Sequence, residues 1–383
     1  MTPCITNTIP LIKPDLPTLD EIRGPLEEIL SNGRITNFGK YVNEFESETG
    51  ALLRTHAVST SSGTMGLLFT LSALGLKPGQ KVIIPSFTFM ATAQAVLYAG
   101  GIPVFAEIDD DLNMSPSDLG DLLACHEDVG AVIAVHMYGL PAKVDQIQEV
   151  VRQASERCGR KIPLIFDAAH AFGASFGGQL VGGFGDAEVF SLSVTKVLVS
   201  VEGGMVTTRN AELADRLKRM RNYGIQSNYD AHFPGMNGKM SEFHAILGLY
   251  NLRRISSLMD QRQTAARMYR DRIHRATSFR LTAWPEHVVH TFKDFTILVP
   301  EGHGQGTRDR LVEFLRERGV ETRAYFFPPV HEQKHFACFA TRPLAKTESL
   351  SRRVITLPFF TTISSEDMDA VVEALVAAEK EIL

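Results

Sequence analysis

Three short segments of the chain carry side chains whose types and spacing could do chemistry. The first is Ser61–Thr64, where two serines, a glycine and a threonine precede a helix-like stretch. At the start of a helix, free backbone N–H groups and the helix dipole attract anions, and a glycine lets a ligand approach the backbone closely. The segment could therefore hold a phosphate, although taken alone it is more commonly an ordinary N-cap.

The second segment combines a carboxylate with a histidine. Asp167 ends an apolar run that begins at Leu164, and His170 follows three residues later. Asp167 could pair with a protonated ring nitrogen of a ligand and stabilise that cation. His170 could donate a hydrogen bond to a ligand oxygen. The alternatives are a helix N-cap for Asp167 and an internally satisfied buried side chain for His170.

The third segment contains a secluded lysine. Lys196 follows the apolar, hydroxyl-rich stretch Phe190–Thr195 and precedes Glu202–Gly204. A lysine amine has a pKa of about 10.4 in water and must lose its proton before it attacks a carbonyl. Burial and cationic neighbours lower that pKa, which is how Schiff-base lysines arise. A surface lysine is the alternative among 39 basic residues, but the neighbours of Lys196 favour a functional role.

The order of these three segments adds to what each indicates alone. An anion-binding loop, a carboxylate at a strand end and a secluded lysine are the parts that hold pyridoxal phosphate. The loop would anchor the phosphate, the carboxylate would pair with the pyridinium nitrogen, and the lysine would form the Schiff base.

Short apolar runs that alternate with helix-like segments must position these residues. Because such runs are typical of strands covered on both faces, they predict an α/β fold with a mostly parallel sheet. Active sites in such sheets collect at the carboxyl ends of the strands. The predicted strands are 82–85, 102–106, 131–135, 163–167 and 204–208, and the predicted helices are 64–74, 91–99, 117–124 and 143–157.

Beyond residue 240 the pattern becomes helical and more charged. It predicts helices over 241–252, 255–275 and 307–318, a strand over 295–299 and a Pro/aromatic stretch over 325–330. A closing helix over 365–382 is preceded by Ser364 as a plausible N-cap. We therefore expect a large domain over residues 1–250, an entry segment included, and a smaller C-terminal α+β domain over 251–383.

Composition and charge exclude several classes of protein. The 383 residues are 44% hydrophobic and 22% charged, which is close to a globular average. A net charge of −5, from 39 basic and 44 acidic residues, argues against a nucleic-acid partner. The longest apolar stretches are interrupted well short of the ~20 residues needed to span a bilayer, so we expect no membrane partner. Met1–Cys4 shows no secretory signal, and the scattered cysteines Cys4, Cys125, Cys158 and Cys338 indicate no disulfide framework and no metal site. We expect a cytoplasmic protein.

A series of motifs along the chain is similar to those of one known family. The motifs are Ile35–Gly39, Phe45-Glu46, Ser62–Thr64, Pro78–Thr92, Tyr98–Phe105, His136–Gly139, Asp167–Ala174, Phe190–Lys196, Glu202–Gly204, Gly235–Met236-Asn237, Lys239–Glu242 and Pro328–His331. In this order they resemble the DegT/DnrJ/EryC1/StrS family, the fold-type I pyridoxal-phosphate enzymes that aminate keto-sugars. The resemblance implies a seven-stranded, mostly parallel sheet. Some relatives carry histidine in place of Lys196 and act as dehydratases, so the lysine favours transamination.

The resemblance also implies a role for each site residue. Lys196 would link covalently to pyridoxal 5'-phosphate and carry a proton, and Asp167 would hold the pyridine nitrogen protonated. Phe89 would stack on the ring, unless it is a core residue like most phenylalanines, and His170 would bond the ring hydroxyl oxygen. The phosphate would be held by Ser62, Gly63, Thr64 and Ser191.

One implied residue comes from the resemblance alone. Asn237 would reach the phosphate of the neighbouring subunit, so the family's site is shared across a homodimer. The implied reaction moves an amino group from an amino acid, L-glutamate by the habit of the family, to a keto-sugar linked to a nucleotide. Such a step serves amino-sugar, antibiotic or polysaccharide biosynthesis.

Several positions depart from the family pattern. Asn237 is followed by Gly238 and Lys239, where an aromatic residue and an arginine are common, and lysine lacks the planar fork of arginine. Val201 replaces a frequent glycine, and Leu192 and Ser193 replace phenylalanine and histidine. The alternatives are therefore a free keto-cyclitol or other small ketone as acceptor, another pyridoxal-phosphate reaction such as dehydration or racemisation, and a non-catalytic regulatory protein on the same scaffold.

Overall fold

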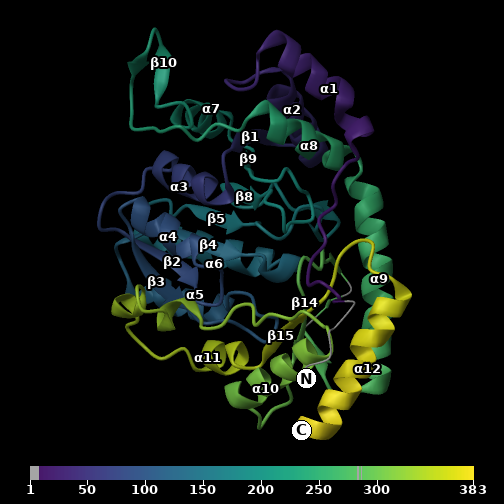
Figure 1. Ribbon diagram of the computed structural model, residues 1–383. Coiled ribbons are helices and arrows are strands. Elements are labelled where there is room, and N and C mark those ends of the chain that lie inside the picture. The colour runs from purple at the N-terminus through teal and green to yellow at the C-terminus, as the bar shows by residue number, and fades with distance from the viewer. Residues whose placement is uncertain (1–7, 283, 286) are drawn as a thin grey trace.

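A seven-stranded sheet forms the centre of the protein (Figure 1). The computed structural model describes residues 8–282, 284–285 and 287–383. The strands lie in the order β1-β9-β8-β5-β4-β2-β3, and β8, β5, β4, β2 and β3 run parallel while β9 is antiparallel to both neighbours. The predicted α/β fold with a mostly parallel seven-stranded sheet is thus confirmed. The strands are β1 His56–Thr60, β2 Lys81–Pro85, β3 Ile102–Ala106, β4 Val129–Val135, β5 Leu164–Asp167, β8 Ala187–Ser191 and β9 Gly204–Thr208.

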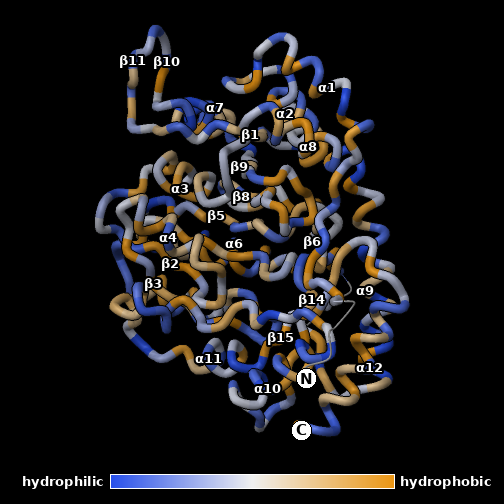
Figure 2. Tube along the Cα trace, viewed as in Figure 1, coloured by the Kyte–Doolittle hydropathy of each residue, from blue (hydrophilic) through white to orange (hydrophobic). Residues whose placement is uncertain are grey.

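Helices cover both faces of this sheet. One apolar cluster joins the strands to α3, α4 and α7, and another joins them to α5 and α6. Figure 2 shows hydrophobic residues gathered along the central strands and hydrophilic residues on the outer loops. The strands read as continuous apolar runs because both of their faces are buried. These helices are α3 Gly63–Ala73, α4 Ala91–Tyr98, α5 Pro116–Cys125, α6 Val144–Cys158 and α7 Ala211–Met220.

The N-terminal helices α1 Leu19–Asn32 and α2 Lys40–Leu53 pack beside α8 Glu242–Arg253. Glu242, the first residue of α8, caps α2 across the chain: its carboxylate accepts the backbone N–H of Tyr41 at 2.7 Å and of Val42 at 3.1 Å. Gly39 lets this carboxylate come close, since a Cβ at that position would lie 2.6 Å from Glu242 Cδ. The sequence patterns did not predict α1 or α2.

The C-terminal part packs around its own apolar cluster. Figure 1 shows α9 Ile255–Ala276 and α12 Ser365–Ile382 side by side along one edge of the molecule. Ser364 caps α12 by accepting the N–H of Asp367 at 3.0 Å, as the sequence predicts. The predicted division at residues 250 and 251 would pass through α8 and remains a prediction. The other elements here are α10 Gln305–Glu317, α11 Ala345–Ser351, β12 Arg280–Leu281, β14 Phe295–Leu298 and β15 Val354–Leu357.

Small elements complete the fold. The pair β10 Ile225–Ser227 and β11 Asp230–Ala231 forms a hairpin that projects from the body in Figure 1. A three-stranded sheet joins β13 Val288–Val289, β6 Ser175–Phe176 and β7 Gln179–Leu180, and single 3-10 turns cover 137–139, 330–332 and 337–339.

Two sequence expectations concern the membrane and the cysteines. Within the described ranges, no helix is both long and apolar enough to cross a bilayer. Cys125, Cys158 and Cys338 are exposed free thiols. The segment Met1–Cys4, expected to carry no signal, lies outside the described residues.

Candidate active site

One cavity of about 380 Å³ brings together eight of the nine residues that the sequence singles out. It lies at the carboxyl ends of β5 and β8, because Asp167 is the last residue of β5 and Ser191 the last of β8. This is the edge at which parallel sheets place their sites. The eight residues are Ser62, Gly63, Thr64, Phe89, Asp167, His170, Ser191 and Lys196.

The segment at residues 62–64 opens α3 toward the cavity. Ser62 is the N-cap, and its Oγ accepts the N–H of Met65 at 3.2 Å, so the capping interpretation holds. Gly63 packs tightly, since a Cβ there would lie 3.1 Å from the Cβ of Ser191. The first N–H groups of a helix have no partner within it. Ser62 therefore caps α3 and also lines the cavity, and the start of this helix offers N–H groups to an anion beside Ser191.

Asp167 is buried at the floor of the cavity. Its Oδ2 accepts the hydroxyl of Thr92 at 2.8 Å, and its Oδ1 accepts the N–H of Ala169 at 3.1 Å. Residues 169–170 and 172–173 form turns, so Asp167 does not cap a helix. Burial raises the pKa of Asp167 above its ordinary value, and the two hydrogen bonds only partly offset this. A cation bound against the carboxylate would favour its ionised form.

Lys196 lines the same cavity and has an altered pKa. Its surroundings lower the pKa of the amine to about 7, first by desolvation and then by the positive charge of Lys293. Asp294 and Asp167 oppose this shift. An amine with a pKa lowered this far is much more readily unprotonated at neutral pH than an ordinary lysine, and the unprotonated form can attack a carbonyl. Lys196 is therefore not the ordinary surface lysine of the alternative interpretation.

Aromatic rings form one wall of the cavity. Phe89 is 50% exposed, so it is not a core phenylalanine. The ring of Phe326 lies 6.0 Å from that of Phe89 and stacks on His170 at 6.1 Å. Burial and the charges of Lys196 and Lys293 lower the pKa of His170 well below its ordinary value, so its imidazole is neutral at neutral pH.

Three cavity residues come from the C-terminal part, and sequence reasoning did not assign them. Lys293, Tyr325 and Phe326 line the cavity beside the residues of the sheet. Tyr325 and Phe326 lie in the predicted Pro/aromatic stretch, which was the available signal. Lys293 lies just before β14 and belongs to no sequence motif that would have marked it as a site residue. Two contacts hold this Pro/aromatic stretch against the sheet. The hydroxyl of Tyr138 donates to the backbone oxygen of Tyr325, and Nδ1 of His331, the residue that follows the stretch, lies 2.6 Å from Ser86 Oγ.

Asn237 is the ninth predicted residue, and it is not among those that line the cavity. It is exposed, and it bridges to Asn222 beside the projecting hairpin. The next residue, Gly238, packs against the ring of Phe69, because a Cβ at this position would lie 2.3 Å from Phe69 Cε2. Lys239 donates to Asn222 Oδ1 at 3.3 Å. Within one chain, this segment stands apart from the cavity.

The remaining departures from the family pattern lie close to the site. Val201 has a φ of 71°, the left-handed conformation that a β-branched residue disfavours and a glycine adopts freely. Ser193 lines the cavity, whereas Leu192 is fully buried in the apolar core.

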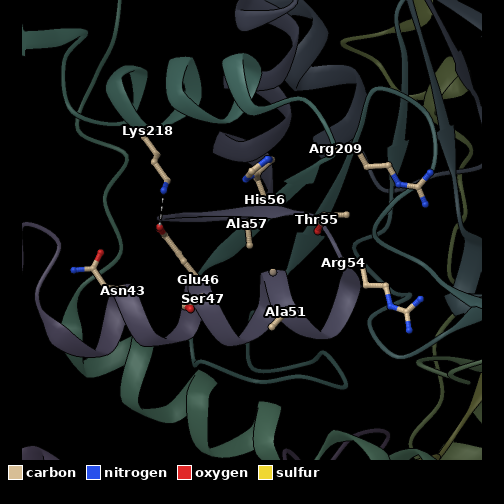
Figure 3. A pocket seen from close by; sticks show the side chains of 11 residues that line it. Asn43, Glu46, Ser47, Ala51, Arg54, Thr55, His56, Ala57, Arg209 and Lys218 are labelled. Carbon is tan, nitrogen blue, oxygen red and sulfur yellow. Dashed lines mark ion pairs between the residues drawn. The ribbon is translucent and has the colours of Figure 1, made fainter.

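A second hollow of about 600 Å³ lies between α2, β1 and α7 (Figure 3). Lys218 reaches toward Glu46, with 3.8 Å between Nζ and Oε2, and Arg54 and Arg209 lie at the other end. None of its eleven lining residues lines the cavity of Lys196. The site residues that the sequence predicts therefore do not extend into this second hollow.

Comparison with known proteins agrees with the motif resemblance. The sequence profile of the DegT/DnrJ/EryC1/StrS aminotransferase family matches residues 18–376. A UDP-N-acetyl-3-dehydro-alpha-D-glucosamine 3-aminotransferase of Acidithiobacillus ferrooxidans is 34% identical over 92% of both chains. A protein of Geobacillus stearothermophilus named pleiotropic regulatory protein is 31% identical over 93% of both chains. The structure of DesI with its TDP-sugar product is 32% identical, with a TM-score of 0.89 over 98% of this chain and 94% of that one.

Proposed function

The chain belongs to the DegT/DnrJ/EryC1/StrS aminotransferase family, and from that premise we propose the substrates, cofactor and assembly that its site serves. It is a sugar aminotransferase. We propose that it takes the amino group of L-glutamate and transfers it to the ketone of a nucleotide-linked sugar. The names of two relatives, which specify a UDP-linked and a TDP-linked sugar, support this acceptor.

The cavity fits pyridoxal 5'-phosphate as the cofactor. The start of α3 and Ser191 would hold its phosphate, and the buried carboxylate of Asp167 would pair with its ring nitrogen. Phe89 would stack on the ring, and His170 would bond its hydroxyl oxygen. The close approach of Gly63 to Ser191 supports this fit, because it brings the start of α3 and Ser191 together where the phosphate would be held.

The reaction places specific demands on this chain's residues. When bound, the cofactor supplies an electron sink for the carbon that bears the amine. Lys196 would link to it covalently and then carry a proton between the α-carbon of the donor and the C4′ atom of the cofactor. The Lys196 pKa of about 7 in the cofactor-free chain suits the first role, because an unprotonated amine is then available to attack the cofactor's carbonyl at neutral pH. Asp167 would keep the ring nitrogen protonated throughout.

The observation that carries the proposal is Lys196, with its lowered pKa, in one cavity with Asp167. The test is the visible absorption of the purified protein, recorded before and after L-glutamate is added. We expect a yellow band that bleaches, and isotopic nitrogen that moves from glutamate to a keto-sugar product. Lys196→Ala should lose the band and reduce turnover at least ~100-fold. Product without transferred nitrogen would contradict transamination.

We also propose a homodimer whose two sites are shared. Asn237 is exposed and lies outside the cavity of its own chain, which is where a residue that reaches a neighbour's phosphate must lie. Mixing Asn237→Asp with Lys196→Ala chains should give heterodimers in which one of the two sites is intact. Failure to form mixed dimers with altered cofactor retention would count against the shared site.

Two alternatives rest on particular observations. Val201 and Ser193 depart from the family pattern close to the cavity, and Lys239 departs from it in the segment outside the cavity. These differences would suit a free keto-cyclitol or another small ketone. A panel of nucleotide-linked and free ketones decides between these acceptors. A regulatory role finds support in the name of the Geobacillus relative. Cofactor binding without any amino transfer across the panel would favour that role.

We propose a cytoplasmic location, where nucleotide-linked sugars are made.

A further inference from the structure

Two buried polar atoms face each other beside the cavity. Nδ1 of His170 and Oδ2 of Asp294 lie 3.9 Å apart. The side chains are only 7% and 1% exposed, and neither atom has a hydrogen-bond partner among the residues that the structure describes. Burying a polar group without a partner is unfavourable, so such a pair calls for a physical account.

Lys293 explains why only one oxygen of Asp294 is free. Its Nζ lies 2.6 Å from Asp294 Oδ1, and both side chains are almost fully buried. The ion pair is made by the carboxylate form of Asp294, and a carboxylate can only accept hydrogen bonds. The free Oδ2 therefore needs a donor, and His170 Nδ1 is the ring atom that it faces.

Hydrogen bonds hold this segment firmly against the sheet. Thr291 Oγ1 donates to the backbone oxygen of His170 at 2.7 Å, and the N–H of Lys293 donates to the oxygen of Tyr138 at 3.0 Å. From the other side, Arg262 Nε donates to the oxygen of Thr291 at 2.9 Å. Asp294 thus reaches His170 from a fixed backbone and needs only a small side-chain movement to close the gap.

A bare Nδ1 would point a lone pair at the carboxylate, which is repulsive, whereas a protonated Nδ1 would donate to it. We propose that Asp294 is a positioning residue for His170: its Oδ2 accepts the Nδ1–H of the imidazole while Lys293 occupies its Oδ1. Nε2 is then the ring nitrogen that serves the cavity. It accepts from a hydroxyl when the imidazole is neutral, and it donates to an oxyanion when the ring takes a second proton.

Other charges around the pair act on the second proton. The groups that face His170 are Lys196, Lys293, Asp294 and His290, and those that face Asp294 also include Arg262, Tyr138 and Tyr325. The cations disfavour the imidazolium, so the ring is singly protonated until an oxyanion enters. The proton on Nδ1 stays in both states. The ligand of Nε2 rests on the proposed function, whereas the proton on Nδ1 does not.

The test is the tautomer of His170, read from the ¹⁵N shifts of histidine-labelled holoenzyme and assigned by the loss of one signal in His170→Gln. We expect a protonated Nδ1 in the wild type from pH 6 to pH 9. Asp294→Leu removes the acceptor and should move the proton to Nε2. Asp294→Asn keeps the shape of the side chain and loses its charge, so it should leave both tautomers populated. This variant decides the test if Asp294→Leu does not fold.

Two control variants separate positioning from packing. Thr291→Val removes a structural hydrogen bond to the same histidine and should leave the proton on Nδ1. Lys293→Met removes the other partner of Asp294 and should leave it there as well. A wild-type His170 with a bare Nδ1, or Asp294 variants that keep the wild-type tautomer, would overturn the proposal. Failure of the proposed function would instead appear as no amino transfer, with the tautomer unchanged.

Discussion

At the scale of single residues, the lowered pKa of Lys196 is the basis of the reactivity that we propose for the site. Desolvation contributes most to the shift, and the charge of Lys293 comes next. Lys293 therefore tunes the pKa of the proposed nucleophile, as in other sites where a second cation activates a lysine. The structure supplies Lys293 from a part of the chain that lies almost a hundred residues away from Lys196.

The pKa of Lys196 predicts how cofactor capture depends on pH. Only the neutral amine attacks a carbonyl, so the rate should rise as pH increases through about 7, rather than near the ordinary 10.4. The measurement is the rate at which the visible band grows when pyridoxal 5'-phosphate is added to cofactor-free protein at each pH. Lys293→Met should shift the midpoint upward, because it removes a nearby positive charge. A midpoint that does not move would show that desolvation acts alone.

Val201 stores backbone strain at a position where glycine is frequent in the family. Its φ of 71° costs a β-branched residue about 1–2 kcal/mol, and glycine loses about 0.5–1 kcal/mol of entropy on folding. Val201→Gly should therefore raise the free energy of unfolding by about 1 kcal/mol or slightly less. Denaturant unfolding measures this. Val194→Gly, at a nearby exposed valine without a positive φ, should lower it.

At the scale of elements, the contact between α2 and α8 depends on a missing side chain. The carboxylate of Glu242 caps α2 only because Gly39 leaves room for it. Gly39→Ala would place a Cβ 2.6 Å from Glu242 Cδ. We expect this overpacking and the loss of the cap to lower the free energy of unfolding by about 2 kcal/mol.

A second glycine provides the control for that prediction. Gly120 lies inside α5, where a Cβ would make only an ordinary contact of 3.8 Å with Val150. Gly120→Ala should therefore stabilise the protein by about 0.5–1 kcal/mol. Both values come from urea unfolding. If Gly39→Ala raised the free energy of unfolding, as Gly120→Ala should, the tight contact between Gly39 and Glu242 would be refuted.

At the scale of the whole molecule, the C-terminal part completes the cavity by docking on the sheet. Gly139 lies at this contact with a φ of 91°, and a Cβ there would lie 1.8 Å from Thr291 Oγ1 and 2.6 Å from the backbone oxygen of His170. Gly139→Ala should cost more than about 3 kcal/mol of unfolding free energy, from backbone strain and the clash together. It should also weaken cofactor binding, since Lys293 and Tyr325 would be displaced.

Gly159 provides a control that separates the backbone strain at Gly139 from the steric clash there. Its φ is 67°, and nothing lies within 4 Å of the position of its Cβ. Gly159→Ala should cost only about 1–2 kcal/mol and leave cofactor binding unchanged. Thermal unfolding together with a cofactor titration distinguishes the two variants. Equal effects of both substitutions would mean that docking does not depend on the contact at Gly139.

The sequence patterns by themselves determined the α/β class, most strands of the central sheet and six of the eight residues that meet in the cavity, whereas Phe89 and Ser191 came from the family resemblance. Those features follow from local patterns: continuous apolar runs mark strands buried on both faces, and strand ends and helix starts lie where a parallel sheet places its site. The strands β1 and β8 escaped the patterns because hydroxyl, charged and other polar residues shorten their apolar runs.

The tertiary structure alone decided what those residues touch. Lys293, Asp294 and Phe326 reach His170 and Lys196 through packing between segments far apart in the chain, and no local pattern encodes such a meeting. The pKa of Lys196 is decided in the same way, because desolvation and charge act through space rather than along the backbone.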